Sequence, residues 1–275
     1  TIGNPEPSYV PLQFWFCRNP GLALPLIALQ YHEVKIKITF CSVADLVKAG
    51  ATDATATSLA STKLWCDYIY LDTDERRRFA QVSHEYLIEQ VQHTGIESLE
   101  SGSTNEKITL NYNHPVKSLH WVIQDDAYNG SDNQVVVSTS NHILDQNKNL
   151  GGGQKLVYAA VAASNGTNDT FKDAKLMLNG HDRAPVRKAD YFRLVQNSAH
   201  MDASPTKTIY TYSFALRASE HQPSGTCNFS RIDNATLSMT FAGNQTADNK
   251  HLKIYAVNYN VLRIMSGMGG LAYSN

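Results

Sequence analysis

The sequence lacks several features that would point to particular classes of protein. Its charges balance, with 24 Lys and Arg against 25 Asp and Glu, so it has no basic excess of the kind that a nucleic-acid-binding face needs. Arg18, Pro20 and Pro25 interrupt the apolar stretch from 14 to 29, which is too short for a membrane-spanning helix. No secretory signal is visible. The chain begins with Thr1, and we expect it to be truncated or processed at its N-terminus.

Cysteine is scarce and scattered. Cys17, Cys41, Cys66 and Cys227 form no C-x-x-C pair, which argues against a zinc cluster and against a disulfide scaffold. Free cysteine usually packs as a small hydrophobic side chain. We therefore expect reduced, buried thiols, which suits assembly in a reducing cytosol.

Signatures of catalysis and cofactor binding are also missing. The chain has no G-x-S-x-G elbow, Walker-type loop, H-E-x-x-H or G-x-G-x-x-G motif. The His-Glu pairs at 32–33 and 84–85 would point to opposite faces of a strand and could not chelate one ion together. Glu220, His221 and Ser224 form a nominal triad, but neighbours in one turn rarely reach triad geometry. We expect no enzyme, no metal site and no cofactor.

Alternating strands are what the sequence does contain. Tyr210, Tyr212 and Phe214 alternate with polar residues in the segment 208–216, and the segment 235–241 alternates in the same way. A period of two over this length is typical of half-buried antiparallel strands. The connector Glu220–Asn234 between them is long and rich in turn residues, and we interpret it as architectural.

Similar patterns predict the other elements. Further strands are expected at 12–17, 34–40, 65–71, 84–92, 107–113, 116–124, 134–140, 174–179 and 252–264. The pair 107–113 and 116–124 is predicted to form a hairpin, and 252–264 to be central and buried on both faces. Short helices are expected at 72–83, where Asp72 and Glu75 resemble a capping box, and at 190–198.

Regularly spaced strands with long loops predict an all-β fold, a jelly-roll β-sandwich with short helical insertions. The strands in 1–45 are too few to be stable alone, and the Ala-, Thr- and Ser-rich segment 46–63 is typical of a linker. Residues 64–275 form the main predicted domain. Among the Asn-x-Ser/Thr sequons, we expect the loop positions Asn129, Asn165 and Asn168 to be the best candidates for glycosylation.

Three stretches of the chain resemble one protein family. Residues 213–241, SFALRASEHQPSGTCNFSRIDNATLSMTF, closely resemble the C-terminal segment of the double jelly-roll major capsid proteins of nucleocytoplasmic large DNA viruses. Residues 12–40 are similar to the end of the first jelly roll, and residues 67–92 to the start of the second, closest to the algal-virus and giant-virus branches. The family's Q-P-S-G turn and N-x-S-R motif correspond here to Gln222, Pro223, Ser224, Gly225, Asn228, Ser230 and Arg231.

This resemblance implies a structural role. Family members form homotrimers, which pack as pseudo-hexagonal capsomers in an icosahedral shell around an internal membrane. The expected partners are further copies of the chain, neighbouring capsomers and minor capsid proteins, with no direct nucleic-acid contact. The expected location is the virion capsid, assembled in the host cytoplasm. Residues 1–45 would be the last strands of a first jelly roll, 64–275 would be the second, and the seven motif residues would serve fold closure or subunit contact.

Two rival functions remain at this point. The aromatic strands suggest a carbohydrate-binding jelly-roll module, which would be a folded monomer with exposed aromatic side chains on a concave face. A sandwich hydrolase would instead place an Asp, Glu or His of strongly perturbed pKa in a pocket. The capsid hypothesis predicts large apolar subunit interfaces and no such pocket.

Overall fold

The structure is a computed structural model that describes residues 9–40, 62–125, 169–202, 208–241 and 250–273. Two compact units are distinguished: the smaller contains residues 1–36, 67–90 and 259–275, and the larger contains 37–66 and 91–258. The strands β1 (His84–Leu99) and β9 (Lys250–Met265) contribute residues to both. The predicted strand at 134–140 and the predicted linker, except for its last two residues, lie outside the described residues.

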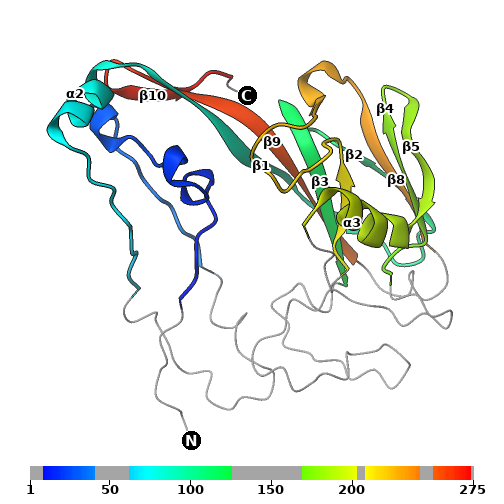
Figure 1. The fold of residues 1–275 in the computed structure, drawn as a ribbon. Helices are drawn as coiled ribbons and strands as arrows, with labels where there is room; N and C mark the ends of the chain where they lie inside the picture. The colour runs from blue at the N-terminus through cyan, green and yellow to red at the C-terminus, as the bar shows by residue number, and fades with distance from the viewer. Residues whose placement is uncertain (1–8, 41–61, 126–168, 203–207, 242–249, 274–275) are drawn as a thin grey trace, which may run out of the picture. The chain divides into compact units, whose positions relative to one another are not determined.

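The larger unit is a sandwich of two antiparallel sheets (Figure 1). One sheet has the strand order β1-β9-β3-β6, with β7 also paired to β3, and the other has the order β2-β8-β4-β5. Their remaining bounds are β2 Asn105–Thr109, β3 Pro115–Asp125, β4 Asp173–Leu178, β5 His181–Lys188, β6 Tyr210–Ser213, β7 Cys227–Asn228 and β8 Ala235–Thr240. The inner faces of both sheets share one hydrophobic core.

A cluster of aromatic rings fills part of that core. Trp121 of β3 is 1% exposed, and its ring centroid lies 5.3 Å from that of Phe192, 6.0 Å from that of Tyr210 and 6.5 Å from that of Phe171. Phe192 belongs to the π-helical turn η5 (Tyr191–Val195), which continues into α3 (Gln196–His200). The predicted helix at 190–198 is therefore confirmed, and its inward side closes this part of the core.

A β-bulge sets which side chains of β3 point inward. The register with β9 shifts between Val116 and Ser118, and such an extra residue changes the phase of the alternation. Val116 on one side of the shift and Leu119 and Ile123 on the other are therefore all buried in the core. The same shift gives β3 one continuous apolar face despite the change in spacing.

The opposite face of β3 carries a short polar chain. The His120 ring lies 2.9 Å from Ser118 Oγ through Nε2 and 3.1 Å from Thr211 Oγ1 through Nδ1. Burial, with a smaller contribution from the positive charge of Lys117, lowers the pKa of His120 to about 4. His120 therefore stays neutral near pH 7 and links β3 to β6 by hydrogen bonds.

The predicted hairpin between 107–113 and 116–124 is wrong. β2 pairs with β8 in one sheet, whereas β3 pairs with β6 and β9 in the other. The prediction of which face of each strand is apolar is confirmed, because Ile108, Trp121 and Ile123 are all buried in the same core. They meet face to face across the sandwich, since the short connection crosses between sheets and does not turn back within one.

Other strand predictions near this core are confirmed with changes. β8 alternates buried and half-buried residues as expected, and β9 is central, between β1 and β3. β9 is not buried on both faces, however, because Tyr255 and Val257 are only half-buried. β6 ends at Ser213, where the N–H groups of Phe214 and Ala215 both donate to the Lys117 carbonyl.

β5 (His181–Lys188) was not predicted from the sequence. Asn179 and Gly180 connect β4 to β5 with positive φ angles of 51° and 81°, and Leu178 pairs with His181 across them. This is the two-residue Asn-Gly hairpin turn. The strand was overlooked because HDRAPVRK is charged and contains Pro185, features that suit a sheet edge. β5 is indeed the last strand of its sheet.

In the smaller unit, the prediction of a helix after Asp72 is confirmed. α2 spans Thr73–Gln81, and the Asp72 carboxylate accepts a hydrogen bond from the Glu75 N–H at 2.9 Å. β10 (Met268–Leu271) pairs with the end of β9. The Tyr31 N–H donates to the Gly267 carbonyl at 2.9 Å, and Arg18 forms an ion pair of 2.5 Å with Glu89. These contacts connect the N-terminal segment to the turn between β9 and β10 and to β1.

The predicted strand at 12–17 is wrong. This part of the chain forms the single 3₁₀ turns η1 (Trp15–Cys17), η2 (Pro20–Leu22) and η3 (Leu26–Ala28). The Asn19 side chain caps η2 by accepting a hydrogen bond from the Gly21 N–H at 2.9 Å. Two prolines and this cap favour tight turns over an extended strand.

The predicted strands at 34–40 and 65–71 have no strand pairing among the described residues. A β-strand is defined by hydrogen bonds to a neighbour, so a correct alternating pattern is not sufficient by itself. Their apolar side chains remain exposed: Phe40 is 54% exposed, Trp65 79% and Tyr70 88%. The thiols of Cys17 and Cys66 are also exposed, which corrects the expectation of buried cysteines for these two positions.

Candidate functional site

The connector Glu220–Asn234 is the site that the sequence singled out, and it lies in the larger unit. Its middle is attached to β3: Cys227 pairs with Val116 and Asn228 with Pro115. The Lys117 Nζ donates to the Glu220 carbonyl at 3.3 Å. The connector is therefore fixed to the central part of the sandwich at two places along its length.

Ser224 and Gly225 close the first turn of the connector. The Ser224 hydroxyl accepts from the Arg217 N–H at 3.0 Å and donates to the Arg217 carbonyl at 3.2 Å. Gly225 has a φ of +143°, and a Cβ added there would lie 2.8 Å from the Phe214 carbonyl oxygen. The turn therefore needs a residue without a side chain at position 225.

Asn228 and Ser230 hold the second turn, η6 (Phe229–Arg231). The Asn228 side chain accepts from the Ser230 N–H at 3.1 Å, and the Ser230 hydroxyl accepts from the His114 N–H at 2.9 Å. Between them Phe229 is 3% exposed and contacts the Tyr112 and Phe214 rings edge-on, with centroids 6.0 and 5.8 Å away. One apolar anchor and two polar caps thus hold this turn on the core.

Gln222, Pro223 and Arg231 differ from the other four motif residues. All three are exposed, but so are Gly225, Asn228 and Ser230, so the difference lies in their contacts. No hydrogen bond or ion pair connects their side chains to the described part of the chain. The contacts therefore separate the motif into four residues that shape the connector and three exposed residues whose side chains make no such bond.

The nominal triad is not assembled. The Ser224 hydroxyl is occupied on both sides by the Arg217 backbone, and the Glu220 carboxylate lies 3.0 Å from the Arg217 guanidinium. A nucleophile needs its hydroxyl proton directed at a base, whereas this one is directed at a carbonyl oxygen. The connector has the geometry of a folded turn.

Replacing Gly225 with Ala is expected to lower the free energy of unfolding by about 1–3 kcal/mol, because the Cβ meets backbone and the φ is strained. Urea unfolding of the two proteins would measure the difference. Gly102→Ala is the matched control, since Gly102 also has a positive φ, +85°, but has open space around its Cβ position. Equal losses in the two variants would contradict the clash at position 225.

The predicted glycosylation positions Asn129, Asn165 and Asn168 lie outside the described residues. Two other sequon asparagines, Asn228 and Asn234, are exposed, and both belong to the connector. Within the described ranges, no group of three or more His, Cys, Asp and Glu side chains could hold a metal ion. No helix in those ranges is long and apolar enough to cross a membrane.

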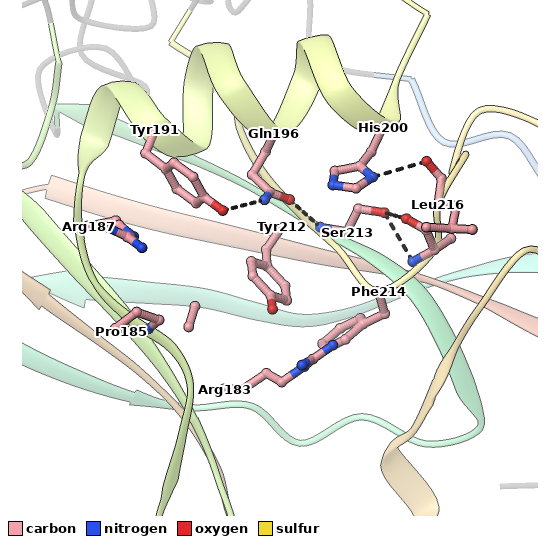
Figure 2. A pocket seen from close by; sticks show the side chains of 12 residues that line it. Arg183, Pro185, Arg187, Tyr191, Gln196, His200, Tyr212, Ser213, Phe214 and Leu216 are labelled. Carbon is pink, nitrogen blue, oxygen red and sulfur yellow. Dashed lines mark hydrogen bonds between the residues drawn. The ribbon is translucent and has the colours of Figure 1, made fainter.

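A pocket of about 300 Å³ lies beside β6, the strand that precedes the connector. Figure 2 shows its lining side chains, which come from β5, from η5 and α3, and from β6 with the turn after it. The lining includes Arg183, Arg187, His200 and the tyrosines Tyr191 and Tyr212, but no Asp or Glu. This composition does not provide the carboxylate pair with which many hydrolases work.

Comparison with known proteins places the chain in a family. Residues 75–270 match the family model described as "Large eukaryotic DNA virus major capsid protein", and residues 2–72 match "Major capsid protein N-terminus". The chain belongs to the major capsid protein family of large eukaryotic DNA viruses. This confirms the resemblance that the connector motif and the other two stretches indicated.

Individual members of the family are similar over almost the whole chain. The major capsid protein of Pyramimonas orientalis virus is 50% identical over 97% of this chain, and that of Phaeocystis pouchetii virus is 44% identical over 97%. The chain spans 61% and 65% of the length of these two relatives. It therefore corresponds to a little under two thirds of each.

A solved capsid structure has the same fold. The quasi-atomic model of the PBCV-1 virus capsid has a TM-score of 0.67 and 37% sequence identity, and the match covers 97% of this chain and 70% of that one. The jelly-roll β-sandwich with short helical insertions is thereby confirmed as the fold class. The two sheets of the larger unit are therefore the two layers of a jelly roll.

Proposed function

We propose that the chain is a structural capsid protein that forms homotrimers, and that these pack as pseudo-hexagonal capsomers in an icosahedral virion shell. Family membership over nearly the whole chain carries this proposal. We also propose the remaining expectations of the family: contact with neighbouring capsomers and minor capsid proteins, an internal membrane nearby, and assembly in the host cytoplasm. The role is structural and needs no catalytic centre.

The same comparison supports the proposed division of the chain. The two family models meet between residues 72 and 75, which supports an N-terminal part related to a first jelly roll and a C-terminal part that is the second. The proposed segments are 1–45, 46–63 and 64–275. The boundary between residues 63 and 64 lies closest to the place where the two family models meet.

Exposed apolar side chains support burial in an assembly. Ile36, Ile38 and Phe40 alternate along one extended segment and are 37%, 46% and 54% exposed, while Trp65 and Tyr68 on another segment are 79% and 66% exposed. Groups of large apolar side chains are rarely left in water by soluble proteins. We propose that both segments are covered by protein in the virion.

The connector supplies candidate residues for contact between subunits. Gln222, Pro223 and Arg231 are exposed, and we propose that they contact neighbouring subunits. Ser224, Gly225, Asn228 and Ser230 serve fold closure through the hydrogen bonds and the glycine geometry already described.

The mass of the purified full-length protein in solution tests the proposal. Light scattering coupled to size exclusion is expected to give three copies per particle. Arg231→Glu should shift the particles toward monomers while leaving the unfolding transition of the monomer unchanged. A protein that is strictly monomeric at all concentrations would argue against the capsomer and favour the carbohydrate-binding alternative.

A further inference from the structure

Two hydrogen bonds attach the N-terminal segment to the hairpin of β9 and β10. The Tyr31 N–H donates to the Gly267 carbonyl at 2.9 Å, and the Gly269 N–H donates to Nδ1 of the His32 ring at 3.1 Å. Gly267 lies in the turn after β9, and Gly269 lies in β10. Residues 29–32 therefore form a strap along this hairpin, and strap and hairpin both belong to the smaller unit.

The strap and the hairpin approach each other closely because glycines stand at the points of contact. A Cβ added at Gly267 would lie 2.5 Å from the Tyr31 ring. One added at Gly269 would lie 3.1 Å from the Leu29 side chain and 3.7 Å from His32 Nδ1. The absence of side chains at these two glycines allows the His32 ring to reach the backbone of β10.

The direction of the second hydrogen bond makes it sensitive to protonation. A backbone N–H can only donate, so His32 Nδ1 must accept, and an imidazole nitrogen accepts only while it carries no proton. In a protonated ring both nitrogens are donors, and the Nδ1–H would then point at the Gly269 N–H. Histidine is the side chain that gains such a proton between about pH 8 and pH 5. The bond is therefore present near neutral pH and is lost as the pH falls.

Three other described histidines have the opposite arrangement. A ring nitrogen of His84, His93 and His200 lies 2.8, 2.9 and 3.0 Å, respectively, from a backbone carbonyl oxygen. A carbonyl oxygen only accepts, so these rings donate, and protonation leaves each donor in place. Acid is therefore expected to break the strap's hydrogen bond and to leave these three intact.

The charged groups on the elements around the strap already have partners. β10 carries no charged residue. Beside the strap in the chain, Glu33 pairs with Lys35 at 2.9 Å. Near the end of β9, Arg263 pairs with Glu85 of β1 at 2.8 Å. Each of these carboxylates is engaged by a cation, so neither is left to hold a charged His32 in place.

We propose that His32 forms a pH-sensitive contact, which holds the strap on β10 while the ring is neutral and releases it when the ring is protonated. The bond between the Tyr31 N–H and the Gly267 carbonyl does not depend on protonation, so the strap loosens locally and the unit stays folded. This device gives the protein a response to acidic surroundings at one place in the fold. It goes beyond the capsid role and does not depend on it.

Hydrogen–deuterium exchange of the full chain in its native assembly, at about pH 7.5 and about pH 5.5, tests the contact. After correction for the intrinsic exchange rate at each pH, exchange in the peptide 266–271 should rise about three- to tenfold in acid, the factor that corresponds to one lost hydrogen bond. His32→Asn should abolish the rise, because its amide oxygen takes the place of Nδ1 and does not titrate. His32→Phe removes the acceptor and should raise exchange at both pH values.

His200→Asn is the matched control, because the His200 ring donates to a carbonyl oxygen and lies in the larger unit. It should leave exchange in the peptide 266–271 unchanged at both pH values. The absence of a rise in wild type, or an equal rise in His32→Asn, would overturn the proposal. Light scattering at the same pH values should show intact particles, and a rise that occurs only when the particles dissociate would also overturn it.

Discussion

Trp121→Ala is expected to lower the free energy of unfolding by about 3–5 kcal/mol, the usual cost of removing a large aromatic side chain from a core. Trp121 is 1% exposed and contacts the rings of Phe171, Phe192 and Tyr210, which come from three different segments. Its removal leaves a cavity that these segments cannot all close at once. Urea unfolding at matched protein concentration would measure the loss.

Trp121→Phe is the control for this prediction. The Trp121 indole N–H has no hydrogen-bond partner among the described residues, so replacing it with Phe removes volume and an unsatisfied donor together. We expect Phe to cost clearly less than Ala. If Ala cost under about 1 kcal/mol, the aromatic cluster would not be the centre of the core.

Asp169→Ala is expected to destabilise the fold by a similar amount, about 3–5 kcal/mol, because it removes one partner of a buried ion pair. The Asp169 side chain is 4% exposed, and its two oxygens accept from Arg193 Nε at 2.6 Å and Nη2 at 3.2 Å. The Tyr210 hydroxyl also donates to it at 3.2 Å. Without the carboxylate, Arg193 and Tyr210 both lose an acceptor while they remain largely shielded from water.

The pair between Glu85 and Arg263 provides a matched control for that ion pair. It has a similar separation, 2.8 Å, but its side chains are 57% and 51% exposed. Glu85→Ala is expected to cost at most about 1 kcal/mol, since exposed pairs are well solvated. Thermal unfolding of both variants would compare them, and equal losses would show that burial of Asp169 is not what makes its pair important.

Local patterns predicted much of this fold correctly. The alternation in 235–241 specified β8, because every second side chain must lie on the same face of a strand. Asp72 and Glu75 specified the start of α2, because the cap is made within one turn. The errors were of a different kind: the residues of β2 and β3 were recognised as strands but assigned to one hairpin, since the alternating pattern does not identify the strand's neighbour.

The site shows the same division. The motif from Gln222 to Arg231 could be recognised from its amino-acid sequence. Which of its residues form the turns could not, because that depends on distances to Phe214, Arg217 and His114. The pocket could not be predicted at all. Its arginines lie on β5, which the Asn179-Gly180 turn would have revealed, and Tyr212 was assigned only to a strand face.

The family, the all-β class and the faces of most strands could be predicted from the amino-acid sequence, because they depend on local alternation, helix capping and short sequence motifs. The folded structure was needed to establish which strands pair, which apolar segments are exposed, and that Arg183, Arg187 and Tyr212 line the same cavity. The physical reason is that pairing and pocket formation depend on contacts between residues far apart in the chain. Such contacts are set by how the sheets pack, and no short window of sequence contains them.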